Sequence, residues 1–314
     1  MSRFYDALKQ ASSSDLILNG HSVEEKREGV PGNNGIHVSA VASNGKSNGS
    51  AAAVASTTPD TGTADPWVIS PDREPHQRRN ESLNASLEGL ARVAVDRNAR
   101  VIPNAVDPTV IEHYRRLRTK IMQQHATKPF RSLLITSASP QEGKTVTVLN
   151  LALSFAMLPS FRVLVIDGDI RRGTLGKWLG SSDRPGLSNL IDGSAGVGDV
   201  IFQCDDLPVR FLARGTSQMP AAELLHSSQL SAHFRSMTEQ FDLVLVDSPP
   251  VNLLTDTQLL AANCDAVLLV TRAFATSRKA LEKAVQDLTP FRVIGTVLNG
   301  GARVRSYGGY KGYY

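Results

Sequence analysis

Long apolar runs alternate with amphipathic stretches between residues 130 and 300. The runs are nearly continuous, as is typical of strands covered on both faces of a parallel sheet. They lie at 131–137, 162–168, 242–248, 265–271 and 292–299, with a further strand near 209–215. Apolar residues at helical spacing predict helices at 144–157, 174–179, 187–192, 220–238, 254–262 and 277–289. This alternation predicts an α/β fold with an open, mostly parallel sheet flanked by helices, which binds ligands at the carboxyl ends of its strands.

The residues ahead of this region follow a different pattern. Phe4, Leu8 and Ala11 fall at helical spacing and predict a short amphipathic helix at 1–12, unless this end of the chain is simply frayed. Residues 13–104 are rich in Ser, Gly, Asn and Ala and contain few large apolar side chains. Such a segment buries too little surface to offset the entropy of ordering, so we expect a disordered linker.

The folded part is predicted to begin with another helix. Val110, Tyr114, Leu117 and Ile121 share one helical face after Pro108. The chain therefore divides into a helix at 1–12, a linker at 13–104, a folded domain at 105–300 and a tail at 301–314.

Composition narrows the class of protein. The formal net charge of +4 is modest and the basic residues form no long run, so nucleic acid is not an expected partner. Cys204 and Cys264 are far apart and form neither a disulfide framework nor a zinc motif, which fits a reducing compartment. The longest apolar stretch, 146–158, is shorter than the about 20 residues that a bilayer requires. The first residues lack the apolar core of a signal peptide, and we expect a cytoplasmic protein.

A phosphate-binding motif follows the strand at 131–137. Residues 138–145 read ASPQEGKT, which is the pattern G-x-x-x-x-G-K-[ST] with Ala at the first position. Such a loop points backbone N–H groups at phosphates from the start of a helix. Gly143 permits close approach, Lys144 neutralises the phosphates and Thr145 offers a hydroxyl to Mg²⁺. The strand before the motif and the helix after it predict a P-loop.

Acidic residues end the next two buried strands of this kind. Asp167 and Asp169 lie at the end of the strand at 162–168, and Asp247 lies at the end of the strand at 242–248. Each alone could cap a helix or a turn. Together, beside a P-loop, they predict a site for Mg²⁺ and nucleotide phosphates.

The tail is unusual in composition. Residues 301–314 read GARVRSYGGYKGYY, and four of the six tyrosines of the chain lie in the last eight residues. Because glycine makes the tail flexible, its tyrosines could reach an active site on the same or a neighbouring subunit. A sticky terminus, or aromatic and arginine contacts with nucleic acid or glycan, would be alternatives.

These motifs resemble those of the bacterial tyrosine kinases of polysaccharide export, of the cytoplasmic single-domain type, within the wider group of ParA- and MinD-like ATPases. The matching segments are ITSASPQEGKT, VLVIDGDIR and LVLVDSPP, together with PGLSNLIDG, PAAELLHS and an E-x-x-R-x-x-R helix. The similarity covers residues 108–314. It implies a P-loop kinase domain that transfers phosphate from ATP, with Mg²⁺, to tyrosine.

The resemblance assigns roles to individual residues. Nucleotide contacts are expected from Ser139, Gln141, Glu142, Gly143, Lys144, Thr145, Val146 and Asn299. The expected metal ligands are Thr145, Asp169 and Asp247, and the expected catalytic residues are Lys144, Asp167, Asp169 and Arg171. Whether Asp167 or Asp169 accepts the tyrosine proton stays open. The expected autophosphorylation sites are Tyr307, Tyr310, Tyr313 and Tyr314.

The resemblance also implies partners. Glu112, Arg115 and Arg118 would contact a neighbouring subunit of a ring, although a solvated helix face with ion pairs explains the same spacing. A membrane protein like a chain-length determinant would activate the kinase and recruit it to the inner face of the membrane. A tyrosine phosphatase would reverse the reaction. The expected role is control of exopolysaccharide or capsule synthesis and export.

Two positions depart from the family pattern. Gln141 replaces the usual Gly, and Gly173 replaces a usual Pro. A loop position that requires positive φ resists Gln, so Gln141 raises the alternative of a nucleotide-binding scaffold without turnover. The other alternative is a ParA- or MinD-like ATPase switch. That group often has an additional Lys early in the loop, and the matching position near Ser139 has none.

Overall fold

The computed structural model describes residues 35–39, 67, 90, 92–93, 108–204 and 208–301. The strands within this part of the chain are β1 (Gly35–Ser39), β2 (Arg92–Val93), β3 (Ser132–Ser137), β4 (Val163–Asp167), β5 (Ile201–Cys204), β6 (Arg210–Leu212), β7 (Leu243–Asp247), β8 (Ala266–Arg272) and β9 (Val293–Gly301). The helices are α3 (Pro108–Thr127), α4 (Lys144–Ala156), α5 (Thr174–Trp178), α6 (Leu187–Asp192), α7 (Val197–Val200), α8 (Ala221–His226), α9 (Ser228–Gln240), α10 (Asp256–Ala261) and α11 (Arg278–Asp287).

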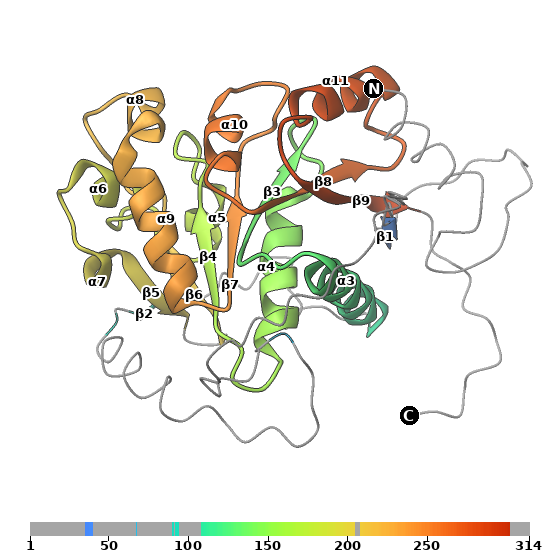
Figure 1. Ribbon diagram of the computed structural model, residues 1–314, viewed down its shortest axis with the longest axis horizontal. Helices are drawn as coiled ribbons and strands as arrows, with labels where there is room; N and C mark the ends of the chain where they lie inside the picture. Colours follow the sequence, from blue (N-terminus) through green and yellow to red (C-terminus); the bar gives the residue numbers. More distant parts are fainter. Residues whose placement is uncertain are drawn as a thin grey trace, which may run out of the picture.

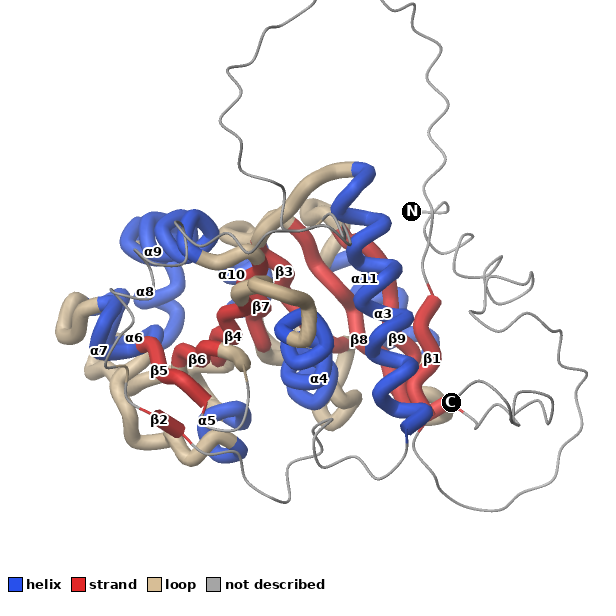
Figure 2. Tube along the Cα trace, turned by 90° about the horizontal axis from the view of Figure 1, so that it is seen from below, coloured by secondary structure: helices blue, strands red, loops and turns tan. Residues whose placement is uncertain are grey.

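The strands of the described residues form one sheet in the order β1-β9-β8-β3-β7-β4-β6-β5-β2 (Figures 1 and 2). Every pair from β9 through β6 is parallel, whereas β1 on β9 and β5 on β6 are antiparallel. The central strands are apolar and fully buried, as the continuous runs in the sequence predicted. The α/β class with a mostly parallel sheet is therefore confirmed.

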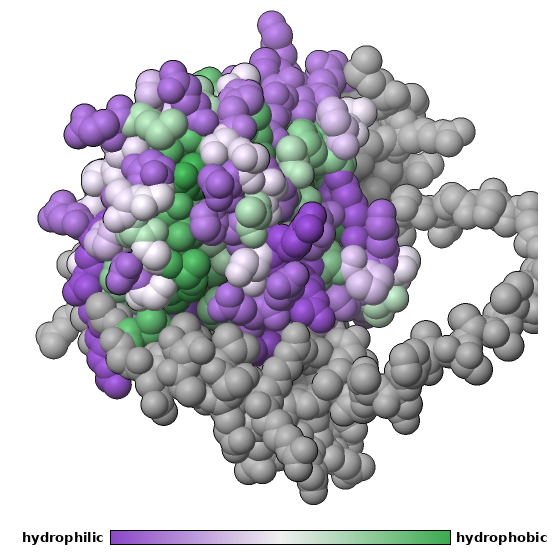
Figure 3. Space-filling model, turned by 60° about the vertical axis from the view of Figure 1, so that its left-hand side comes forward, coloured by the Kyte–Doolittle hydropathy of each residue, from purple (hydrophilic) through white to green (hydrophobic). Residues whose placement is uncertain are grey.

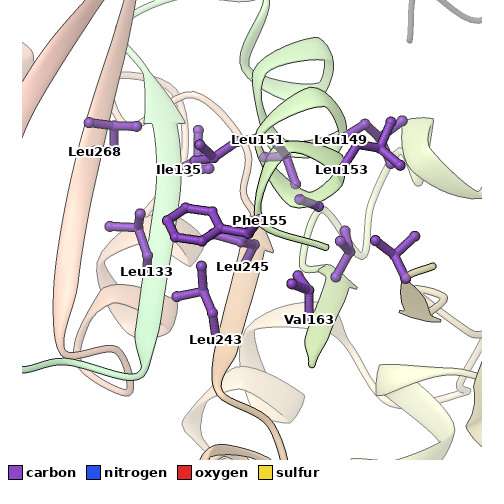
Figure 4. Close-up of a cluster of buried hydrophobic side chains, with 14 of the residues drawn as sticks. Leu133, Ile135, Leu149, Leu151, Leu153, Phe155, Val163, Leu243, Leu245 and Leu268 are labelled. Carbon is purple, nitrogen blue, oxygen red and sulfur yellow. The ribbon is translucent and has the colours of Figure 1, made fainter. Parts of the chain in front are cut away.

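Helices cover both faces of the sheet, and successive residues of each strand point into opposite cores. On one side, α3, α4 and α5 pack on alternate residues such as Leu133, Val163 and Leu245. Figure 4 shows Phe155 of α4 among leucines of β3 and β7. On the other side, α6 and α8 to α11 pack on the intervening residues. Since burying one such side chain contributes about 1.5–3 kcal/mol, these two cores supply most of the stability that fixes the strand ends.

Polar residues dominate the outside. On the face shown in Figure 3, most residues are hydrophilic, and apolar ones gather in one strip. Large apolar side chains that are exposed in the described residues include Met157, Met219, Leu253 and Phe274. No helix of the described residues combines the length and the apolar composition needed to cross a bilayer.

Within residues 108–301, element positions agree closely with those predicted, with three differences. The helix predicted at 220–238 is two helices, α8 and α9, because Ser227 is extended and its Oγ accepts the N–H of Gln229 to cap α9. The short helix α7 and strand β5 were not predicted. Each is four residues long, too short for a periodic pattern to stand out.

The predicted linker needs a correction at the described positions within it. Residues 35–39 form β1, which pairs with the edge of β9 from Gly35 opposite Gly301 to Ser39 opposite Thr296. Trp67 is buried, and its ring stacks on His125 with the centroids 3.9 Å apart. Both features depend on partners supplied by the folded domain, which local composition does not reveal. The predicted helix at 1–12, most of the linker and residues 302–314 lie outside the described residues.

Candidate functional site

The turn from β3 into α4 has the geometry of a phosphate-binding loop. Gly143 precedes the helix with φ of 96°, and Lys144 is the first helical residue. A side chain at residue 143 would be strained at this positive φ, and its Cβ would also lie 1.9 Å from Nδ2 of Asn299, so glycine is favoured there. Val146 is half-buried in the first turn of α4. The free N–H groups at the start of α4 therefore lie where the sequence placed the nucleotide phosphates.

Gln141 stands where the family has glycine, and it adopts the left-handed backbone conformation that glycine favours. Its φ is 62°, a region that side chains disfavour. The Gln141 carbonyl oxygen accepts a hydrogen bond from Nη1 of Arg272 at 2.9 Å. The loop thus keeps its shape without the glycine, and a contact from the end of β8 accompanies the strained residue.

Glu142 is buried and faces the protein. Its Oε1 accepts from Oγ1 of Thr276 at 2.5 Å, and its Oε2 accepts the N–H of Ser139 at 3.1 Å. The Glu142 carbonyl oxygen accepts from Nδ2 of Asn299 at 3.0 Å. Burial raises the pKa of this carboxyl group. Because both carboxylate oxygens have partners, Glu142 shapes the loop from behind.

Asp247 connects the loop to the centre of the sheet. Its Oδ2 accepts the hydroxyl of Thr145 at 2.7 Å, and Nζ of Lys144 lies 3.8 Å from its Oδ1. Asp247 is fully buried, which raises its pKa, whereas Lys144 and the bond from Thr145 oppose that rise. Lys144 and Thr145, which were predicted to hold phosphate and metal, are therefore brought together with Asp247 across β3 and β7.

Asp167 lies beside Asp247, because β4 and β7 pair with these two residues opposite each other. Gly168 makes this approach possible. Its N–H donates to the Asp247 carbonyl oxygen at 2.8 Å, and a Cβ there would lie 2.7 Å from that oxygen. Burial, followed by the charge of Asp247, raises the pKa of Asp167 to about 8. Its Oδ2 accepts the N–H of Gly176, while Oδ1 is buried without a hydrogen bond. Asp167 can therefore accept a proton at the carboxyl edge of the sheet.

Asp169 and Arg171 have more local roles. Oδ1 of Asp169 accepts the N–H of Arg172 at 3.2 Å, and the side chain is buried. Arg171 was predicted to neutralise phosphate charge. In the structure its guanidinium donates to both carboxylate oxygens of Asp256 at the start of α10, at 2.6 and 3.1 Å, which raises the pKa of Arg171, and its role toward phosphate stays a prediction. Asp256 is buried, so this pair fixes the loop after β4.

The side chains of the site suit a cation that binds both protein and phosphate oxygens better than a cation that is bound by protein alone. Among the residues that the structure describes, no group of three His, Cys, Asp or Glu side chains is arranged to hold a metal ion. A magnesium ion commonly keeps several waters and binds one or two protein oxygens together with substrate phosphates. The Thr145 hydroxyl beside the buried carboxylate of Asp247 suits that arrangement.

The predicted subunit contact divides into exposed and inward-facing residues. Glu112 forms ion pairs with Arg115 at 3.9 Å and with Arg116 at 3.4 Å on the surface of α3. Arg118 instead donates to the carbonyl oxygen of Ser154 near the end of α4. Burial lowers the pKa of its guanidinium, and Arg115 lowers it further. Arg118 thus attaches α3 to the helix that follows the P-loop.

Sequence reasoning missed Asp256, Arg272 and Thr276. Arg272 is the last residue of the buried strand β8 and Thr276 follows four positions later, at the edge where ligands bind, and that position is the signal that could have indicated them. The predicted tyrosine sites of the tail lie outside the described residues.

Comparison with known proteins finds similarity to bacterial tyrosine kinases. No protein-family model matches the chain. It is 32% identical over 193 residues to a putative tyrosine-protein kinase, CapB, of Staphylococcus aureus, which covers 61% of this chain and 84% of that protein. It is 31% identical over 208 residues to the tyrosine-protein kinase CpsD of Streptococcus agalactiae, covering 64% of this chain and 89% of CpsD. The kinase domain of the Escherichia coli tyrosine kinase ETK superposes with a TM-score of 0.58 at 28% identity, over 67% of this chain and 83% of that domain.

Proposed function

This chain belongs to the bacterial tyrosine-kinase family, and from that premise we propose that it transfers the γ-phosphoryl group of ATP to tyrosines of its own tail. The observation that carries the proposal is the cluster of Lys144, Thr145 and Asp247 beside the buried carboxyl group of Asp167. In this arrangement, one side holds phosphate and the other can accept a proton.

The P-loop binds the nucleotide. N–H groups at the start of α4 and the ammonium group of Lys144 hold the phosphate oxygens, with Thr145, Asp169 and Asp247 around Mg²⁺. When bound there, Mg²⁺ would neutralise charge on the phosphates. Asn299 and Val146 flank the loop where the rest of the nucleotide extends. Catalysis of phosphoryl transfer then depends mainly on positioning and charge stabilisation.

Asp167 is the proposed general base. The phenolic oxygen of a tail tyrosine forms a bond to the γ-phosphorus while the bond between that phosphorus and the β–γ bridging oxygen breaks, and ADP leaves. Asp167 acts in its ionised form, which becomes populated as the pH rises through its pKa of about 8, and the phenolic proton then passes to its Oδ1, the oxygen that is buried without a hydrogen bond. Both carboxylates accept a backbone N–H, but of the two only Asp167 has an oxygen that is buried without a hydrogen bond, so we assign the metal role to Asp169. Arg171, held by Asp256, keeps the loop that carries both carboxylates in place.

The proposed setting follows from the same family. The protein works in the cytoplasm, forms homo-oligomers through the exposed face of α3 around Glu112 and Arg115, and is recruited to the membrane by an activator like a chain-length determinant. A tyrosine phosphatase reverses its modification. Phosphorylation cycles of the tail then regulate exopolysaccharide or capsule synthesis and export.

Mass spectrometry of the purified chain tests the proposal. With ATP, Mg²⁺ and the activator's cytoplasmic segment, phosphate is expected on Tyr307, Tyr310, Tyr313 or Tyr314, and Lys144→Met is expected to remove it. Tyr114 is fully buried and serves as an internal control that stays unmodified. A phosphotyrosine signal of equal strength from Lys144→Met would contradict the proposed role of the P-loop, and phosphate only outside the tail would contradict the proposed acceptor.

A further inference from the structure

The turn between β8 and α11, residues 272–276, contacts the back of the P-loop at two points. Nη1 of Arg272 donates to the Gln141 carbonyl oxygen, and Oγ1 of Thr276 donates to Oε1 of Glu142. The turn is closed on itself, since the backbone N–H of Arg272 donates to Oγ1 of Thr276 at 2.8 Å and the N–H of Thr276 donates to the Arg272 carbonyl oxygen at 3.0 Å. We propose that this turn is a brace that holds the P-loop in its nucleotide-binding shape, with Arg272 and Thr276 as positioning residues. The proposal rests on the proposed role of the P-loop as the ATP site.

The brace acts through the geometry of the peptide bond. In a trans peptide unit, the C=O and the following N–H point in opposite directions. Arg272 holds the carbonyl of Gln141 toward the turn, so the N–H of Glu142 points away from it. Asn299 holds the carbonyl of Glu142, so the N–H of Gly143 is fixed in the same manner. Both N–H groups belong to the loop that receives the phosphates, where convergent N–H groups form an anion site.

Gln141 is the reason why this chain requires the contact. Glycine adopts positive φ freely, whereas Gln141 is held at a φ of 62° against a steric preference. Without Arg272, the peptide after Gln141 could relax toward a more favourable conformation, and its N–H would turn away from the phosphates. The dependence of the loop on Arg272 is therefore tied to the identity of residue 141.

Thr276 fixes the orientation of the acidic side chain in the loop. Glu142 places a carboxylate within a loop that binds anions, which would oppose phosphate if the group were free to turn. The hydroxyl of Thr276 and the N–H of Ser139 hold its two oxygens away from the phosphate side. Phe274 at the tip of the turn is 96% exposed and also has positive φ, at 60°. Such backbone strain persists only where surrounding contacts impose it, and the bonds between Arg272 and Thr276 close the turn on both sides of Phe274.

A double-mutant cycle tests the brace. The chain, Arg272→Met, Gln141→Gly and the double variant are titrated with a non-hydrolysable ATP analogue and Mg²⁺ by calorimetry. Arg272→Met is expected to raise Kd about tenfold in the presence of Gln141 and less than about twofold together with Gln141→Gly, a coupling typical of residues in contact. Arg278→Met is the matched control, because Arg278 is exposed and pairs with Glu282 on the surface of α11. It is expected to leave Kd unchanged.

Hydrogen exchange of the nucleotide-free chain gives an independent measure. Faster exchange of the amides of Ser139 and of residues 141–143 is expected for Arg272→Met and for Thr276→Val, while Thr276→Ser, which keeps the hydroxyl, is expected to restore protection. A tenfold rise in Kd that is the same with and without Gln141→Gly would overturn the coupling, and unchanged Kd and exchange would overturn the brace. If the parent chain failed to bind the analogue while its exchange still responded to Arg272→Met, the proposed function would fail and the structural brace would stand.

Discussion

Asp167 shows what burial does to one residue of the site. In the unfolded chain its pKa is near 3.8, and in the fold burial and Asp247 raise it to about 8. Between these pH values the folded chain holds a proton that the unfolded chain has lost. Stability therefore falls as the pH rises through this window and is lowest, for this group, above pH 8.

Asp167→Asn is accordingly expected to stabilise the nucleotide-free protein more at pH 8 than at pH 5. The effect of the substitution on the free energy of unfolding is expected to differ between the two pH values by an amount on the order of a few kcal/mol. Urea unfolding in EDTA at the two pH values measures the difference. Asp183→Asn, at an exposed position, is the control and is expected to have little effect at either pH. An identical effect of Asp167→Asn at both pH values would argue against a buried neutral carboxyl group.

The site residues that could be predicted are those whose role is indicated by the residues next to them in the sequence. Gly143, Lys144 and Thr145 form a contiguous motif, and Asp247 ends an apolar run that identifies its strand. Thr276 reaches Glu142 across 134 positions, and a lone threonine after a strand has no local signature. Gln141 is intermediate. The sequence raised the question of its backbone, and the answer depended on Arg272, a distant residue.

At the scale of elements, continuous apolar runs identified the central strands because parallel strands are buried on both faces. The pattern failed where tertiary contacts decide the structure. Trp67, within a segment of small polar residues, is one case. It packs on His125, Phe130, Phe155 and Phe161, with ring centroids 3.9 to 5.5 Å away. The folded domain thus includes Trp67, which lies 41 positions before Pro108, the first residue of α3.

Trp67→Ala is expected to lower the free energy of unfolding by about 3–5 kcal/mol, because it leaves a cavity among four rings. Trp67→Phe, which keeps an aromatic ring there, is expected to lose less. Urea unfolding followed by far-UV circular dichroism measures both, and Leu253→Ala at an exposed position is the control. A loss below about 1 kcal/mol for Trp67→Ala would mean that the ring contributes little to the folded state.

At the scale of the whole molecule, the fold class and the place of the site followed from the order of strands and helices. Ligands of open α/β sheets bind at the carboxyl ends of the strands, and Asp167, Asp247 and the P-loop meet there. The division into a helix at 1–12, a linker, a domain at 105–300 and a tail stays a prediction, modified by β1 and Trp67. Long-range pairing by a short segment such as β1 leaves almost no trace in composition.

β1 also has a consequence for how separate molecules behave in concentrated solution. The hydrogen-bonding groups on the outer side of β9 are occupied by residues 35–39. An uncovered edge strand is a template for pairing with another chain. A chain that begins at residue 41 keeps Trp67 but loses this cover, so sedimentation velocity is expected to show larger, concentration-dependent species than a chain that begins at residue 30. A peptide of residues 33–41 is expected to reverse the association, and the same peptide with Val38→Pro is not. Equal sedimentation of the two shortened chains would mean that the edge of β9 does not pair with other molecules when it is uncovered. β1 would then not be the feature that prevents the sheets of neighbouring molecules from pairing.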